Sequence, residues 1–273
     1  MDKDFLPAEA ELRLPRFCRK KKLGLALGGG AVLGFAHIGV LKALTEAGFE
    51  PWAIAGTSAG SIFGGLFCAG LSWREIQDAT KKISWFNLVT PAVPVMGLLK
   101  AEGLEKIIDK LVFSKNIEDL ATPFRAVATD LATGKEVVLD KGPLARAIRI
   151  SCGIPGIFVP FEDGDRLLAD GGLVNNVPVD VVRGMGADYI IAVNVISAAD
   201  GKKPRNIVEV IYRSILILQA GINPGKRQAD ILVRPNLARF SAQDISKKEE
   251  IIAAGEEAMR ELLPHIKALP FSP

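Results

Sequence analysis

The first apolar positions of the chain predict a strand, a glycine-rich turn and a helix. Residues 23–28, LGLALG, are apolar throughout, which is typical of a strand buried on both faces of a sheet. The loop GGGAVLG follows, and Ile38, Leu41 and Leu44 then recur at helical spacing. Gly48 predicts the end of that helix.

A second unit of the same kind follows immediately. The run WAIAG at 52–56 predicts a strand, TSAGS predicts a tight turn, and IFGGLFCAGL at 62–71 predicts an apolar helix. The uncharged stretch from Pro51 to Trp73 is as long as a membrane span. Its glycines and serines instead favour tight packing inside a protein.

Helical and strand patterns alternate through the remainder of the chain. Alternation on this scale predicts an α/β fold with a mostly parallel sheet and helices on both faces. An antiparallel hairpin of FRAVATD and KEVVL, joined by LATG, is expected beside that sheet. The strand patterns lie at 124–129, 135–139, 188–195 and 230–234, and the helical patterns at 72–83, 102–112, 143–151, 178–184, 206–221 and 246–262.

Two segments predict how the remaining parts pack. The segment 84–100, SWFNLVTPAVPVMGLLK, is apolar with no clean period, so it is either a buried connector or a cap beside the functional site. The last predicted helix has its apolar positions on one side, which predicts a covering helix. These positions are Ile251, Ile252, Ala254, Ala258, Met259 and Leu262.

Length and charge limit the number of domains and the kinds of partner. The chain has 273 residues, of which 49% are apolar and 24% charged, so we expect a basic-ended extension at 1–22 and a single domain at 23–273. The 34 basic and 31 acidic residues are too balanced to indicate nucleic acid as the main partner. The basic cluster at 16–22 either contacts an anionic lipid surface or keeps the start of the first strand soluble.

The cysteines and the first residues bear on cellular location. Cys18, Cys68 and Cys152 form no C-x-x-C pair and are too few for a disulfide framework, which favours a reducing compartment. Residues 1–16 have no apolar run of the signal-peptide kind. We therefore expect a cytoplasmic protein and leave open a peripheral position at the inner membrane surface.

The first chemical motif is Gly56-Thr57-Ser58-Ala59-Gly60, which matches G-x-S-x-G between a predicted strand and a predicted helix. Glycines on both sides of the serine allow the backbone to approach closely at a sharp turn. The N-terminus of the following helix favours negative charge on Ser58. The motif predicts a nucleophile at Ser58, and the alternative is a plain packing turn.

The second motif is the loop Gly28-Gly29-Gly30, which offers consecutive backbone N–H groups ahead of a helix. Such groups form either an oxyanion hole or a phosphate cradle. A dinucleotide fingerprint would require glycine at position 33, where the chain has Leu33, and a phosphate loop would require a following Gly-Lys-Ser/Thr. We therefore interpret the loop as an oxyanion hole.

The third motif is Asp170-Gly171-Gly172, and its position after a short apolar run predicts an aspartate at a strand end or in a loop. The chain has only His37 and His265, so a Ser-His-Asp triad would need one of them. We favour neither, because a desolvated aspartate within hydrogen-bond reach can act as the base for a serine.

Together these motifs resemble the patatin-like phospholipase family, in particular its small bacterial members. Residues 23–41 are similar to its glycine-rich oxyanion block, 54–60 to its nucleophile elbow, and 151–178 to the block that supplies its catalytic aspartate. The resemblance implies a three-layer α/β/α sandwich. It also implies hydrolysis of lipid acyl esters, whether phospholipid, lysophospholipid or neutral lipid, without a metal or cofactor.

The resemblance assigns roles to individual residues as well. It implies that Ser58 is the nucleophile and that Asp170 activates it. His37 matches a histidine that is frequent in the family's first block, and the resemblance implies no catalytic role for it. The backbone amides that it implies for the oxyanion hole are those of Gly28, Gly29, Gly30 and Ala31.

One position departs from the family pattern. Members usually carry Arg or Lys where this chain has Leu33, and many have glycine in place of Ala31. A cation there could pair with a phospholipid phosphate. Because Leu33 lacks a charge, a neutral ester, lysolipid or acylglycerol is an alternative substrate, and we expect Ala31-Val32-Leu33 to pack beneath an acyl chain.

Three hypotheses about function remain open. The first is a hydrolase with a Ser58–Asp170 dyad, whose activity needs neither histidine and survives chelators. The second is a Ser-His-Asp hydrolase that uses His265. The third is a non-catalytic lipid or nucleotide binding protein on the same fold.

Overall fold

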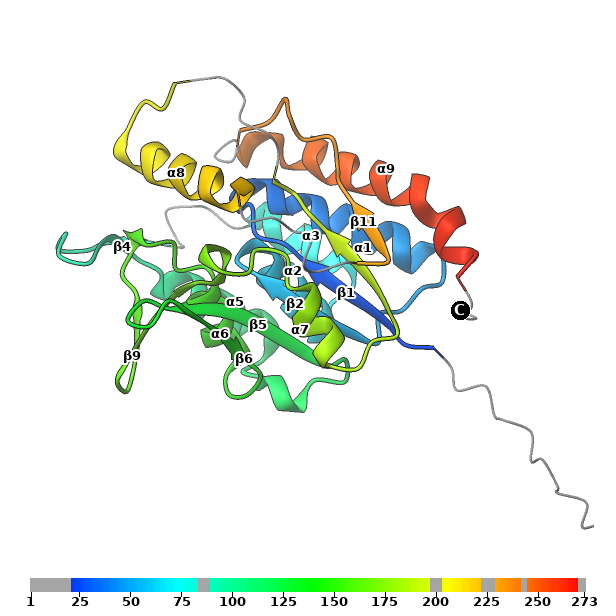
Figure 1. Ribbon diagram of the computed structural model, residues 1–273, viewed down its shortest axis with the longest axis horizontal. Helices are drawn as coiled ribbons and strands as arrows, with labels where there is room; N and C mark the ends of the chain where they lie inside the picture. The colour runs from blue at the N-terminus through cyan, green and yellow to red at the C-terminus, as the bar shows by residue number, and fades with distance from the viewer. Residues whose placement is uncertain (1–20, 83–88, 197–202, 222–228, 242–244, 270–273) are drawn as a thin grey trace, which may run out of the picture.

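The computed structural model describes residues 21–82, 89–196, 203–221, 229–241 and 245–269. Its central sheet consists of β1 (Leu23–Leu27), β2 (Ala53–Thr57), β5 (Phe124–Asp130), β6 (Lys135–Leu139), β8 (Phe161–Asp163), β9 (Arg166–Asp170), β10 (Tyr189–Val193) and β11 (Ile231–Val233). The strand order is β11-β10-β1-β2-β5-β9-β8, and β6 pairs with β5. The strands from β11 to β5 run parallel, whereas β6, β8 and β9 pair antiparallel (Figure 1).

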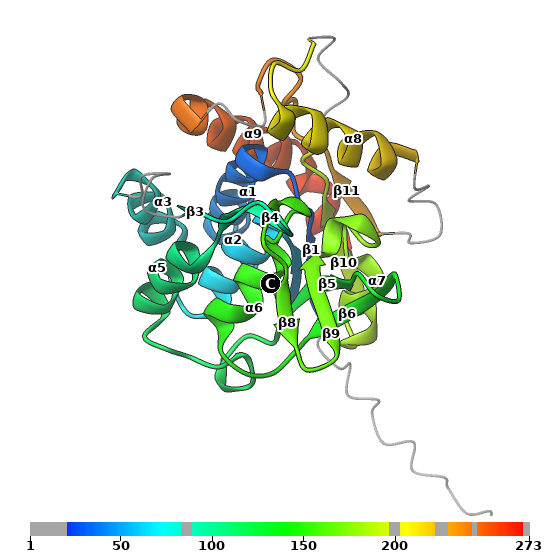
Figure 2. The ribbon, with the colours of Figure 1, turned by 90° about the vertical axis from the view of Figure 1, so that its left-hand side faces the viewer.

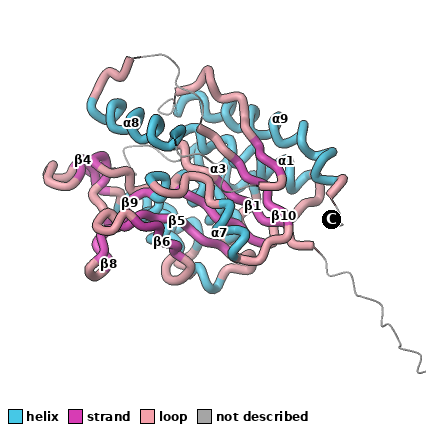
Figure 3. Tube along the Cα trace, viewed as in Figure 1, coloured by secondary structure: helices cyan, strands magenta, loops and turns pink. Residues whose placement is uncertain are grey.

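Eight α-helices of the described residues surround this sheet. They are α1 (Ala36–Glu46), α2 (Ala59–Cys68), α3 (Trp73–Lys82), α5 (Glu102–Val112), α6 (Leu144–Ser151), α7 (Val179–Gly184), α8 (Ile207–Gly221) and α9 (Lys248–Lys267). The strands form a central band with helices around it (Figure 3). The predicted helices and the antiparallel hairpin of β5 and β6 are thereby confirmed.

Alternate residues of each strand contribute to two different hydrophobic cores. In β1, Leu25 and Leu27 pack into the larger core with α1, α2, α6 and α9, while Ala26 faces a smaller core with Val182 of α7. Both faces of the sheet are therefore buried, as period-two side-chain alternation requires. Figure 2 shows α1 and α2 on one side of the sheet and α7 on the other. The predicted three-layer α/β/α sandwich is confirmed.

Helix α9 covers α1 through a close approach of two glycines. A Cβ on Gly39 would lie 2.0 Å from the carbonyl oxygen of Ile252, and a Cβ on Gly255 would lie 2.0 Å from that of Ala36. Ile251 and Met259 are fully buried on the same side of α9. The prediction of a covering helix is correct, and the helix extends five residues beyond the predicted end at residue 262.

A second, smaller sheet lies beside α8 and includes part of the segment 84–100. It consists of β3 (Thr90–Pro91), β4 (Gly97–Lys100) and β7 (Gly156–Phe158), and residues 84–88 lie outside the described residues. Ile157 and Phe158 of β7, together with Ala101 just after β4, are buried and pack with Val208 and Ile211 of α8. The described part of this segment is a small sheet under α8, which favours a cap over a plain connector (Figure 1).

The sequence patterns missed the hairpin of β8 and β9. Its strands have three and five residues and pair antiparallel with each other, and β9 also pairs with β5.

No helix among the described residues is long and apolar enough to cross a membrane. The uncharged stretch from Pro51 to Trp73 instead contains β2 and the ten-residue helix α2.

Candidate active site

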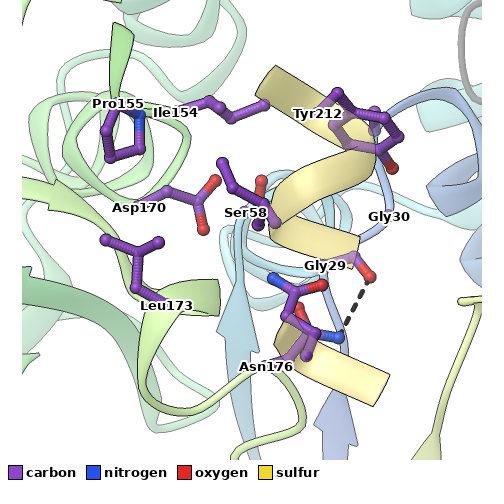
Figure 4. Close-up of a pocket in the computed structure, with 12 residues that line it drawn as sticks. Gly29, Gly30, Ser58, Ile154, Pro155, Asp170, Leu173, Asn176 and Tyr212 are labelled. Atoms are coloured by element: carbon purple, nitrogen blue, oxygen red, sulfur yellow. Dashed lines mark hydrogen bonds between the residues drawn. The ribbon is translucent and has the colours of Figure 1, made fainter. Parts of the chain in front are cut away.

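The three sequence motifs meet at the carboxyl ends of the parallel strands. Strands β1 and β2 are neighbours, and Gly28 follows the end of β1 as Ser58 follows the end of β2. Ligands of open α/β sheets bind at this edge. The pocket there is lined by Gly29, Gly30, Ala31, Ser58, Ile154, Pro155, Asp170, Leu173, Asn176, Tyr212, Ile215 and Gln219 (Figure 4).

Ser58 occupies a strained turn between β2 and α2. Its φ of 51° and ψ of −125° lie in a sparsely populated backbone region, which costs a residue with a side chain about 1–3 kcal/mol. The turn also requires the glycines on either side. A Cβ on Gly56 would lie 2.4 Å from the carbonyl oxygen of Gly60, and a Cβ on Gly60 would lie 2.1 Å from that of Leu27. Strain of this kind is typical of a site where function fixes the backbone.

The backbone of this turn is held by two serine hydroxyls. Ser151, at the end of α6, accepts a hydrogen bond from the Ser58 amide at 2.9 Å and donates one to the Val127 carbonyl at 2.6 Å. Ser61 donates to the Ser58 carbonyl at 2.6 Å. Ser151 begins the block that resembles the family, but the sequence motifs gave it no role. Only the fold brings Ser151 under the Ser58 turn.

Asp170 ends β9 and points toward Ser58 (Figure 4). Burial raises the pKa of its carboxyl from 3.8 to about 6, and the neighbouring Ser58 hydroxyl and the Gly172 amide, which both stabilise the ionised form, oppose that rise. The Gly172 amide lies 2.7 Å from the carboxylate Oδ1. A carboxylate with this pKa is ionised at neutral pH and more basic than an exposed one, as a general base should be.

Close approach of the backbone requires Gly171, the first glycine after Asp170. A Cβ on Gly171 would lie 2.4 Å from the carbonyl oxygen of Val127, whereas one on Gly172 would lie 2.5 Å from the end of the flexible Gln219 side chain. The contacts therefore give a strong physical reason for Gly171 and a weaker one for Gly172.

The glycine loop contributes fewer free amides than its sequence implied. The Gly28 amide donates to the Val193 carbonyl at 3.0 Å, and the Gly29 amide donates to the Asn176 carbonyl at 3.2 Å. The amides of Gly30 and Ala31 have no such partner in the part of the chain that the structure describes. They stand at the start of the 3₁₀ helix Ala31–Phe35, where unpaired N–H groups attract anions.

Neither histidine belongs to the described pocket. His37 is fully buried and its Nε2 lies 2.7 Å from the Gly28 carbonyl oxygen, so it supports the glycine loop from behind. Burial lowers the pKa of His37 to about 4, so the ring is neutral at pH 7 and donates this hydrogen bond. His265 is exposed near the end of α9. No group of three potential metal ligands occurs among the described residues.

Leu33 does not lie where the sequence placed it. Ala31 lines the pocket, but Leu33 is only 4% exposed and belongs to the main hydrophobic core. The expectation that Leu33 packs beneath an acyl chain is therefore wrong, because its side chain points into the protein interior.

Three polar residues of the pocket were not found from the sequence. The side-chain amide of Asn176 donates to the Gly29 carbonyl at 3.3 Å, and that of Gln219 donates to the Gly172 carbonyl at 2.8 Å. Tyr212 stands on α8 one turn before Ile215. Asn176 lies within the 151–178 block and could have been suspected there, whereas nothing local marked Tyr212 or Gln219.

Comparison with known proteins agrees with this fold and these motifs. A family model described as patatin-like phospholipase matches residues 25–183. Over 192 residues the chain is 41% identical to an uncharacterized NTE family protein of Mycobacterium tuberculosis, a match that covers 69% of this chain and 53% of that protein. The chain belongs to the patatin-like phospholipase family, and it spans about half the length of these mycobacterial relatives.

More distant relatives are larger proteins. The chain is 36% identical over 200 residues to neuropathy target esterase sws of Drosophila melanogaster, covering 69% of this chain and 14% of that protein. Among solved structures, VipD from Legionella pneumophila matches with a TM-score of 0.51 and 11% identity, covering 90% of this chain and 67% of that chain. The structural match supports the fold alone.

Proposed function

We propose that this chain is a serine acyl hydrolase that cleaves lipid acyl esters through a dyad of Ser58 and Asp170. The observation that carries the proposal is the buried carboxyl of Asp170, which points toward Ser58 and has its pKa raised to about 6. The strained turn under Ser58 and the family membership support the same assignment. We further propose that residues 23–273 work as one hydrolase domain.

The chemistry follows from the groups in the pocket. The Asp170 carboxylate accepts the Ser58 proton while Oγ attacks the ester carbonyl carbon. The oxyanion that forms receives hydrogen bonds from the Gly30 and Ala31 amides, which are free in the described structure. Asp170 then returns the proton to the leaving alcohol, and water releases the acid from Ser58 by the same steps. No metal or cofactor is needed at any step.

We also propose that a lipid surface meets the protein around this pocket. Helix α8 and the β3–β4 turn expose aliphatic side chains to solvent, which is unusual for a surface without a partner. Lys100, Lys203 and Arg205 are exposed near these elements and would favour anionic lipid. The basic cluster 16–22 lies outside the described residues except for Lys21 and Lys22. The exposed aliphatic residues are Val93, Val95, Met96, Ile207, Val210, Ile217 and Leu218.

Liposome flotation tests this contact. The double variant Ile217→Ser/Leu218→Ser should lose binding to anionic vesicles, because both side chains are exposed on one turn of α8. Phe113→Ser is the matched control, since Phe113 is 86% exposed at the end of α5 and belongs to neither element. Unchanged flotation of the double variant would refute the contact.

Hydrolysis of a short-chain p-nitrophenyl ester in EDTA tests the proposed dyad. Ser58→Ala and Asp170→Asn should abolish activity, while His265→Ala and Asp130→Asn should retain it, because neither His265 nor Asp130 lines the pocket. Loss of activity in His265→Ala would require a triad. A wild-type protein that binds lipid but hydrolyses neither this ester nor a lipid ester would be a binding protein.

A further inference from the structure

Tyr212 has a buried hydroxyl group without a hydrogen-bond partner among the described residues. Leaving such a group unpaired costs about 1–3 kcal/mol, so native proteins seldom do so without a reason. The hydroxyl belongs to a residue that lines the candidate active site. A bound molecule that accepts its hydrogen bond would remove this cost.

Helix α8 holds Tyr212 firmly over the proposed dyad. Ile215 and Gln219 line the same pocket at helical spacing from Tyr212, and Gln219 donates to the carbonyl of Gly172, next to the proposed catalytic aspartate. Burial, and after it the negative charge of Asp170, raises the pKa of Tyr212, so the phenol remains protonated at neutral pH. Figure 4 shows Tyr212 and Asp170 on opposite sides of Ser58.

The other polar groups of the pocket already have partners or an assigned role. Asn176 and Gln219 each use one side-chain N–H on a protein carbonyl, and the free amides of Gly30 and Ala31 are assigned to the oxyanion. The Tyr212 hydroxyl differs from these groups because it is buried without any partner among the described residues, which makes it available to another oxygen of the substrate. The apolar lining residues suit the acyl chain, which leaves the alcohol part of the ester as the partner of Tyr212.

The pocket also indicates what kind of alcohol it accepts. None of its described lining residues is Lys or Arg, and Asp170 carries a negative charge at neutral pH. Burying a phosphate there without a cation would be costly and would add repulsion from Asp170. A neutral hydroxyl or ether oxygen needs only a hydrogen-bond donor, which Tyr212 provides.

We propose that Tyr212 is a specificity-determining residue whose hydroxyl donates a hydrogen bond to a neutral oxygen on the alcohol side of the scissile ester. The substrate class that this favours is a glycerol-type ester without a phosphate beside the scissile bond. The inference rests on the proposed hydrolase function and deepens it.

The test compares Tyr212→Phe with the wild type on two octanoate esters. The glyceryl ester offers neutral oxygens beyond the scissile bond, whereas the ethyl ester offers none. Tyr212→Phe should lower kcat/KM about fivefold to a hundredfold for the glyceryl ester and less than about twofold for the ethyl ester. Ser214→Ala is the matched control, because Ser214 is an exposed hydroxyl of α8 that bonds to its own helix.

Three results would overturn the proposal. Equal losses of kcat/KM on both esters would mean that the Tyr212 hydroxyl stabilises the oxyanion or the fold. No loss on either ester would mean that the hydroxyl has no role in the reaction. A wild type that prefers a lysophospholipid of the same acyl chain to the glyceryl ester would refute the neutral-oxygen preference. The melting temperature of Tyr212→Phe should be unchanged or raised, because the variant removes an unpaired polar group.

A binding measurement separates this proposal from the proposed hydrolase function. Octyl glyceryl ether cannot be hydrolysed, and calorimetry below its micellar concentration can follow its binding to the wild type and to Tyr212→Phe. The variant should bind it about fivefold more weakly or worse, and octyl ethyl ether should bind both proteins equally. This result would support the hydrogen bond from Tyr212 to a neutral oxygen even if no ester were hydrolysed. Equal affinities of the two proteins for the glyceryl ether would refute that hydrogen bond.

Discussion

The buried carboxyl of Asp170 predicts that the proposed catalytic base destabilises the folded protein. Burial raises its pKa from 3.8 to about 6, so ionisation is more costly in the folded than in the unfolded state. Each pKa unit corresponds to about 1.4 kcal/mol, which gives a cost of about 3 kcal/mol above pH 6. The cost is absent below pH 3.8, grows as the pH rises through this interval, and is constant above it.

Replacing Asp170 by Asn should remove this cost. The side-chain oxygen of the introduced asparagine can still accept the hydrogen bond from the Gly172 amide, so the local geometry is preserved. At pH 8 the variant should melt about 5 °C or more above the wild type, since 1 kcal/mol corresponds to roughly 2–4 °C in a chain of this size. At pH 4 the two proteins should melt at nearly the same temperature.

Thermal unfolding monitored by circular dichroism between pH 4 and pH 8 measures this difference. Asp130→Asn is the matched control, because hydrogen bonds, chiefly from the Thr133 hydroxyl, lower the pKa of Asp130. Asp130 is therefore stabilised in its ionised form, and Asp130→Asn should lower the melting temperature at pH 8. The reasoning would be refuted if Asp170→Asn melted below the wild type at pH 8. It would also be refuted if the difference in melting temperature between the two proteins did not vary with pH.

Three further predictions follow from the site. In a pH–rate profile, the kcat/KM of the wild type should rise through about pH 6 and then stay level, because the Asp170 carboxylate must be ionised. An unchanged profile in His265→Ala would show that the titrating group is not His265. Ser151→Ala leaves the Ser58 amide without its acceptor, so urea unfolding should show a loss of about 1–3 kcal/mol and kcat should fall more than KM changes. Ala31→Gly relieves a φ of 48°, so its melting temperature should not fall and its esterase activity should persist.

Much of the fold could be predicted from the sequence because its signals are local. The apolar run of β1, the glycine turn and the helix α1 lie within about 25 consecutive residues, and hydrophobic spacing distinguishes strand from helix over that distance. Ser58 and Asp170 could be singled out as candidates for the same reason, since glycines lie on both sides of Ser58 and directly after Asp170, where the chain makes close approaches. The hairpin of β8 and β9 was missed because its strands, FED and RLLAD, include charged residues and show neither a long apolar run nor a clear alternation.

The rest of the site depends on contacts between distant parts of the chain. Ser151 supports Ser58 across 93 residues, and Gln219 reaches Gly172 across 47. Helix α8 is apolar on both its pocket side and its exposed side, so its spacing alone does not tell which residues line a site. Tyr212 therefore reads as an ordinary helical tyrosine until the fold places its hydroxyl in the pocket.

Leu33 shows how a local comparison can point to the wrong part of a site. Because this position carries a cation in the family pattern, the sequence suggested that Leu33 changes contact with the substrate head group. The side chain instead packs in the main core, where a guanidinium group from Leu33→Arg would be buried without a partner and would destabilise the fold by several kcal/mol. That variant would report on folding, so selection against phosphate has to be tested at the pocket itself, where Tyr212 offers a neutral donor and the described lining residues offer no cation.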